Sequence, residues 1–75
     1  MSQFEKLIQK LKTSKADISL QDLKTLLSSV GYIPVRQKGS HVHFRKPNAP
    51  FLTIPSHKQK VKHVYVKEIL ELLDL

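Results

Sequence analysis

Two histidines separated by one residue, His41 and His43, are the side chains best placed in this sequence for proton transfer. Histidine readily both accepts and donates a proton near neutral pH. From the residues alone, the pair has three interpretations: a surface pair without a role, half of a metal site, and a general acid–base group. The metal interpretation lacks a third ligand, because no carboxylate lies in the middle of the chain. All three interpretations remain open at this point.

The charges around these histidines favour an anionic partner. The chain of 75 residues holds 13 Lys and Arg against 6 Asp and Glu, a formal net charge of +7. No acidic residue occurs from Leu23 through Lys67, whereas an ordinary surface intersperses both signs. The block therefore indicates a polyanion-binding surface, against the alternative of a small protein that is merely basic. Around the histidine pair, the block holds Arg36, Lys38 and Arg45. A second basic cluster consists of Lys58, Lys60 and Lys62.

Several kinds of site are excluded by composition. The chain has no cysteine, so thiol nucleophiles, disulfides and cysteine-based zinc sites are absent. No acid lies between Asp22 and Glu68 to complete a Ser-His-Asp triad, and two glycines are too few for a glycine-rich phosphate loop. We expect no metal, no cofactor and no small-molecule substrate. Because the apolar runs are short, we also expect no contact with a membrane and a cytoplasmic location.

Cleavage of an RNA backbone is compatible with what remains. The 2′-hydroxyl already lies next to the phosphorus, so the reaction needs a base, an acid for the leaving 5′-oxygen, and cations for the phosphorane. A histidine flanked by Arg36, Lys38 and Arg45 offers these groups without a metal.

Helices are predicted on both sides of the basic block. A first helix, Ser2 to about Lys12, follows from capping-box spacing and an apolar stripe. A second begins at Ser19 as N-cap and ends before Gly31. A third runs from about Val64 to the end of the chain. The apolar stripes of the three helices are Phe4, Leu7, Ile8, Leu11; Leu23, Leu26, Leu27, Val30; and Val66, Ile69, Leu70, Leu73.

Between the second and third helices the apolar period becomes two, which predicts strands. Tyr32–Lys38 reads as an edge strand because of Pro34, with Ile33 and Val35 on one side and the basic residues on the other. Gly39-Ser40 forms a tight turn to His41–Arg45, whose Val42 and Phe44 point inward. Pro47-Asn48 forms a second turn, and Phe51–Pro55 is the third strand. Ser56–Lys62 is predicted to be a lysine-rich loop.

The expected fold class is α+β, in the order α-α-β-β-β-α. Helices cover one face of a three-stranded antiparallel sheet, and the other face is basic and bears the histidines. We expect a single domain over 1–75, in which 1–16 form an N-terminal extension helix with its connection and 19–75 form the core. Tyr32 and Tyr65 are expected at packing edges rather than stacked on bases.

Four segments together resemble the HicA toxins, which are small mRNA interferases of type II toxin–antitoxin systems with a double-stranded-RNA-binding-domain-like (dsRBD-like) fold. The resemblance covers about Ser19 to Leu75, and its most specific part is the Gly-Ser-His step followed by an aromatic. The segments that carry it are Leu26–Tyr32, Gly39–Phe44, Leu52–Pro55 with His57, and Val66–Leu70.

The resemblance implies a metal-independent endoribonuclease whose essential histidine is His41, acting as general acid/base. His43 either shares that role or merely neighbours it. The implied partners are mRNA and a HicB-type antitoxin protein that blocks the histidine. The residues expected to bind RNA are Arg36, Lys38, Ser40, Arg45, Lys58, Lys60 and Lys62.

The sequence departs from the usual HicA pattern in three places. It has the extra N-terminal helix, Val42 follows the catalytic histidine where a second histidine is frequent, and His63-Val64 replaces a Pro or Gly at the last helix. The alternative function is a non-catalytic RNA-binding module of dsRBD-like fold, which would keep the basic face and need no histidine on it.

Overall fold

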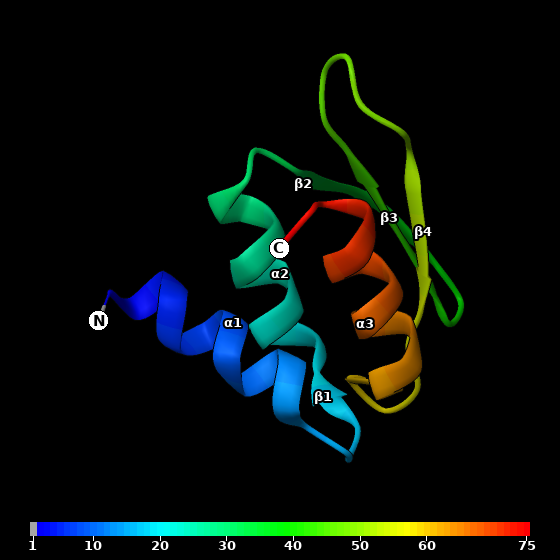
Figure 1. The fold of residues 1–75 in the computed structure, drawn as a ribbon. Helices are drawn as coiled ribbons and strands as arrows, with labels where there is room; N and C mark the ends of the chain where they lie inside the picture. Colours follow the sequence, from blue (N-terminus) through cyan, green and yellow to red (C-terminus); the bar gives the residue numbers. More distant parts are fainter. Residues whose placement is uncertain (1) are drawn as a thin grey trace.

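The computed structural model describes residues 2–75 of the chain (Figure 1). They form the elements α1 (Gln3–Thr13), β1 (Ile18–Ser19), α2 (Leu20–Ser29), β2 (Ile33–Lys38), β3 (His41–Arg45), β4 (Leu52–Pro55), β5 (Lys60–Val61) and α3 (His63–Leu72). Strands β2, β3 and β4 make an antiparallel sheet in that order, and the three helices lie on one side of it (Figure 1). The expected α+β class and dsRBD-like arrangement are confirmed.

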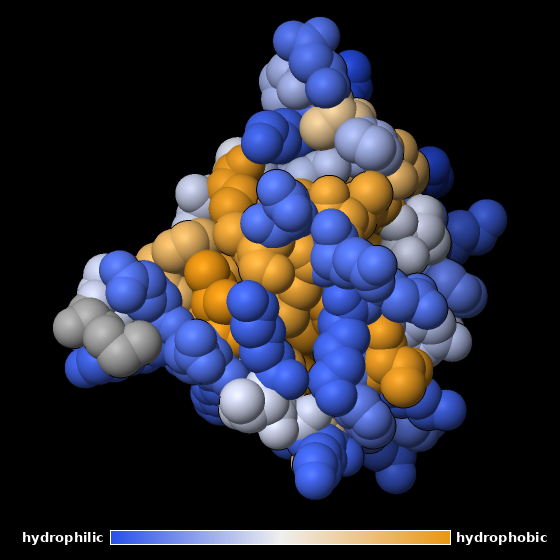
Figure 2. Space-filling view, in the orientation of Figure 1, coloured by the Kyte–Doolittle hydropathy of each residue, from blue (hydrophilic) through white to orange (hydrophobic). Residues whose placement is uncertain are grey.

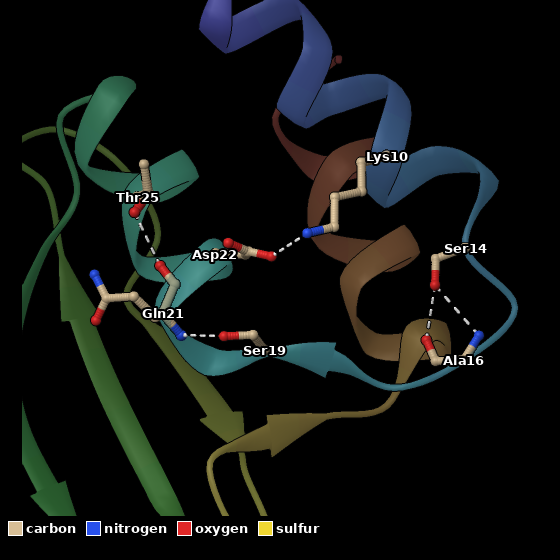
Figure 3. Close-up of polar contacts among 7 residues, drawn as sticks. All are labelled: Lys10, Ser14, Ala16, Ser19, Gln21, Asp22 and Thr25. Carbon is tan, nitrogen blue, oxygen red and sulfur yellow. Dashed lines mark hydrogen bonds and ion pairs between the residues drawn. The ribbon is translucent and has the colours of Figure 1, made fainter.

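Helix α2 forms the middle of the helical layer. The Ser19 side chain accepts a hydrogen bond from the Gln21 backbone N–H at 3.2 Å, as expected of an N-cap (Figure 3). The helix ends before Gly31, whose φ of +96° lies in the region that glycine adopts without a steric penalty. Its inward stripe is fully buried, and consists of Leu20, Leu23, Leu26 and Leu27.

Helix α1 packs against α2 and α3 of the same chain. The Glu5 backbone N–H donates to Ser2 Oγ at 3.1 Å and so caps the helix at the predicted residue. Leu11 is fully buried in the core, and Lys10 Nζ forms an ion pair with Asp22 Oδ2 of α2 at 2.7 Å (Figure 3). In the space-filling view, apolar side chains gather over the helices and are surrounded by hydrophilic ones (Figure 2).

The inner face of the sheet closes the core against α2 and α3. Strand β3 alternates as predicted, with Val42 and Phe44 buried, and strand β4 buries Leu52 and Ile54. Tyr32 is buried, and its hydroxyl donates to the Pro50 carbonyl at 2.8 Å. From α3 the core receives Val66, Ile69 and Leu70. No helix within residues 2–75 has the length and hydrophobicity needed to cross a membrane.

The predicted edge position of β2 is confirmed, but the prediction for its side chains is wrong. Ile33 and Val35 were expected on the side opposite the basic residues, yet both are exposed. The register shifts between Pro34 and Arg36, so Ile33 pairs with Arg45 while Arg36 pairs with His43. A β-bulge of this kind inserts one extra residue, which places Ile33 on the same outward face as Arg36.

The segment Ser56–Lys62 is not the loop that was predicted. Its last part is β5, which pairs with β1 through Ile18 and Val61, and both side chains are buried. Before it, His57 and Lys60 exchange two backbone hydrogen bonds of 2.8 and 2.9 Å. Lys58 and Gln59 between them have φ of +52° and +64°, as in a two-residue type I′ turn. The lysines therefore lie on ordered backbone, and the order α-α-β-β-β-α gains two short strands.

Candidate active site

The outward face of the β2–β3–β4 sheet collects the predicted site residues into rows that run across the strands. Residues directly opposite each other in an antiparallel pair share a face, with Cβ atoms about 4.5–5.5 Å apart. The rows are Lys38–His41–Pro55, Arg36–His43–Thr53 and Ile33–Arg45. The helices cover only the other face of this sheet, so the rows are accessible (Figure 1). The histidine pair and three of the predicted cations thus share one surface.

His41 is the first residue of β3 and follows the Gly39-Ser40 turn. Gly39 has a φ of +59°, the left-handed value that suits the first central position of such a turn. Val42 is buried, so the alternation of the strand turns His41 outward, where it is exposed. Together with Lys38 and Ser40 it lines a shallow depression at this end of the hairpin. The imidazole is therefore open to a ligand and has an ammonium group as its cross-strand neighbour.

His43 is held more firmly than His41. Its Nδ1 lies 3.0 Å from Thr53 Oγ1 in the same row. Its ring stacks on that of Phe51, with centroids 5.5 Å apart and planes at 24°. These two contacts fix the orientation of the ring, and the side chain is half-buried. The ring of His43 is consequently less free than that of His41 to reorient during a proton transfer.

The turn at Ser40 joins this face to the second basic cluster. The Ser56 backbone N–H donates to the Ser40 carbonyl at 2.6 Å. Ser40, Lys60 and Lys62 line one hollow, together with Asp17, Pro55, Ser56, His57 and Tyr65. Pro55 is the cross-strand neighbour of His41, so the hollow adjoins the His41 row. The structure thus brings Lys60 and Lys62 to the edge of the histidine face, while Lys58 lies in the turn beyond them.

Two residues near the site received no role in the interpretation of the sequence. His57 lines the hollow beside Lys60, and Phe51 is exposed next to His43. A signal for Phe51 exists in the sequence, because it precedes the buried Leu52 and is therefore in phase with the outward Thr53. His57 belongs to a segment that carries the resemblance to the HicA toxins, but no strand alternation predicts its position, which depends on the turn with Lys60.

Residues 2–75 contain no group of three or more His, Cys, Asp or Glu side chains placed to hold a metal ion. Asp22, one of the few carboxylates, is paired with Lys10 in the helical layer rather than on the histidine face.

Comparison with known protein families matches most of the chain to a family. Residues 20–75 match the family described as HicA toxin of bacterial toxin–antitoxin, a range that runs from the first residue of α2 to the end of the chain and leaves α1 outside. No curated protein and no solved structure matches the chain. Because the family match spans most of the chain and includes the whole histidine face, this chain belongs to the HicA toxin family and is a toxin of a toxin–antitoxin system, with an antitoxin as its partner.

Proposed function

We propose that this toxin is an endoribonuclease that cleaves mRNA without a metal ion, with His41 as its general acid/base. The observation that carries the proposal is the position of His41, which is exposed on the outward face of the sheet in direct register with Lys38. This face belongs to a stretch of sequence without acidic residues. It attracts the phosphate backbone, and the exposed imidazole supplies the proton transfer.

The reaction is an internal displacement at phosphorus. A base removes the proton of the 2′-hydroxyl, the 2′-oxygen attacks the adjacent phosphorus, and the bond from phosphorus to the 5′-oxygen breaks. The leaving 5′-oxygen receives a proton, so the products are a 2′,3′-cyclic phosphate and a 5′-hydroxyl. His41 carries one of these proton transfers and a solvent water carries the other, while Lys38 and Arg36 balance the negative charge that develops on the phosphorane.

The RNA strand extends beyond the His41 row in both directions. Arg36 and Arg45 lie in the neighbouring rows of the sheet, and Ser40, Lys60 and Lys62 line the hollow at the hairpin end. Lysine side chains there contact phosphates as point charges and fix the register of the strand on the protein. Lys58 is proposed to contact a more distant phosphate, because it lies in the turn beyond the hollow.

The antitoxin is proposed to be of the HicB type and to inhibit by covering His41. A basic face attracts an acidic partner over long distances, so the association is fast and sensitive to salt. A partner seated on the sheet would exclude RNA from His41 and Lys38 together.

Cleavage of a long RNA by the purified protein in EDTA tests the proposal. The parental protein is expected to give fragments with 2′,3′-cyclic phosphate and 5′-hydroxyl ends. The His41→Ala variant is expected to cleave about 10²–10⁴-fold more slowly, the usual contribution of general acid–base catalysis. It should bind RNA normally, because the side chain is exposed and its loss acts on the transition state.

Two other histidines provide the comparison. His43→Ala is expected to slow cleavage less than His41→Ala does, and a larger loss would transfer the role to His43. His63→Ala is the control, since His63 begins α3 and lies outside the rows of the sheet. Cleavage by His41→Ala at the parental rate would refute the assignment. RNA binding by a parental protein that never cleaves would instead identify a non-catalytic RNA-binding module.

A further inference from the structure

The outward face of the sheet exposes a large aromatic ring among its cations. Phe51 is 58% exposed, although Leu52 directly after it is buried. Phenylalanine on a small protein's surface leaves apolar area in water, and exposed patches of this kind frequently mark binding sites. With Val35, Arg36 and His43, Phe51 lines a depression on this face. The ring thus shares a depression with Arg36 and stacks on one histidine of the pair, His43.

Phe51 is held in place on both sides along the chain. Its predecessor, Pro50, accepts a hydrogen bond of 2.8 Å from the hydroxyl of the buried Tyr32. Its successor, Leu52, is buried and pairs with Phe44. The backbone that carries the ring is therefore anchored on both sides, and the stack on His43 orients the ring itself. An aromatic ring that is already oriented loses little conformational entropy when it binds.

The second ring of the pair is equally well oriented. His43 stacks on Phe51 at a centroid distance of 5.5 Å, and its Nδ1 lies 3.0 Å from Thr53 Oγ1. His43 is two residues from His41 along β3, which corresponds to about 6.8 Å at the rise of an antiparallel strand. The stacked pair thus lies in the row of the sheet next to that of the proposed catalytic histidine.

We propose that Phe51 and His43 form a stacking platform for one unpaired base of the RNA, next to the phosphate that reacts at His41. This deepens the proposed function and rests on it for the identity of that phosphate. Bases in single-stranded RNA stack on the rings of Phe, Tyr, Trp and His. The fixed rings fit the flat face of a base, and Arg36 beside them fits the adjoining phosphate, so the surface complements both parts of a nucleotide.

The platform predicts a preference for single strands with little choice of base. A base inside a duplex is covered by its neighbours and offers no free face to Phe51. Every base has a π-face, so stacking on an aromatic ring tolerates all four of them. The toxin would then select unpaired regions of mRNA through the platform, with phosphate contacts contributing affinity but no selection among sequences.

Binding of a short single-stranded 2′-O-methyl RNA tests the platform in the parental chain, because this RNA lacks the 2′-hydroxyl needed for cleavage. Phe51→Ala is expected to weaken binding about 5- to 150-fold, the range for the loss of one stacked base. Phe51→Trp should restore it. Ile33→Ala is the matched control, since Ile33 is 57% exposed on the same face but has no ring, and it should leave the affinity close to parental. Binding of inorganic polyphosphate, which has no bases, should be unchanged in all three variants.

A base analogue reports stacking directly. When 2-aminopurine replaces single bases of the same RNA, its fluorescence is expected to be quenched at one position by the parental protein and by Phe51→Trp, but not by Phe51→Ala. Equal RNA affinity for Phe51→Ala and the parental protein would overturn the proposal. A loss of polyphosphate binding by Phe51→Ala as large as its loss of RNA binding would also overturn the proposal. A loss of antitoxin binding by Phe51→Ala with RNA binding intact would overturn it as well and would assign Phe51 to the protein partner.

Cleavage assays separate this proposal from the nuclease assignment. If the parental protein cleaves long RNA and Phe51→Ala cleaves it with an unchanged KM, the platform is refuted and the nuclease stands. If the parental protein does not cleave but its binding of single strands depends on an aromatic ring at position 51, the stacking site stands and the nuclease is refuted.

Discussion

Replacing Leu11 with alanine tests whether α1 belongs to the cooperative core, because this helix lies outside the segment that matches the HicA family. Leu11 is fully buried, and α1 packs against both α2 and α3. Truncation of a buried leucine to alanine costs about 2–5 kcal/mol, because transfer free energy is forfeited and a cavity remains. A domain of this length has a total unfolding free energy of only about 4–11 kcal/mol. The change therefore removes a large part of the stability.

The loss of unfolding free energy is measurable by urea denaturation and by thermal denaturation, each followed by the circular dichroism of the helices. A loss of about 3 kcal/mol corresponds to a fall in Tm of about 12–24 °C for a domain of this size. Leu72→Ala is the matched control, since Leu72 is 53% exposed at the end of α3 and its truncation should change the free energy by at most about 0.5 kcal/mol.

A loss below about 1 kcal/mol for Leu11→Ala, with an unchanged m-value, would contradict the reasoning, because a core leucine does not give so small an effect. It would show that α1 detaches at little cost and that its apolar stripe is buried elsewhere, on a partner or on a second copy of the chain.

Two further predictions concern the basic surface and the hairpin. The double variant Lys60→Gln with Lys62→Gln should bind a non-cleavable single strand with a smaller slope of log affinity against log salt concentration, by about 0.7 for each phosphate that the protein no longer neutralises. Lys58→Gln should reduce the slope less, because Lys58 does not line the hollow. Equal slopes for all variants would place the RNA elsewhere. Gly39→Ala should lower the unfolding free energy by about 1–2 kcal/mol, because position 39 has a positive φ that alanine adopts at a cost. Steric contact adds nothing to this cost, since a Cβ at position 39 would meet no atom within 4 Å. A denaturation curve that matches the parental one would show that the turn has changed conformation.

The elements that carry a strong local signal were predicted correctly. Helix α2 has Ser19 as its N-cap and ends before Gly31, because the helix ends themselves require a side-chain acceptor and a residue free to adopt positive φ. The turns at Gly39 and Asn48 also have the positive φ that their residue types suggested. The outward position of His41 follows from the alternation of one strand, since Val42 has to be buried.

Positions that depend on distant partners were not predicted. Strands β1 and β5 have two residues each, too few for any periodic pattern, and they exist because Ile18 and Val61 are buried against each other. The bulge in β2 likewise follows from pairing with β3, and it moves Ile33 to the outward face.

The sequence by itself determined the charge of the molecule, the outward position of His41 and the order of its main elements. Each of these depends on residue type or on neighbours within a few positions, where dihedral preferences and the periods of helix and strand act directly. The tertiary structure alone decided that Lys60 and Lys62 share a hollow with Ser40, and that Phe51 stacks on His43. Such contacts join residues on different strands and turns, and they form only once burial of the apolar faces has fixed how the strands and helices pack.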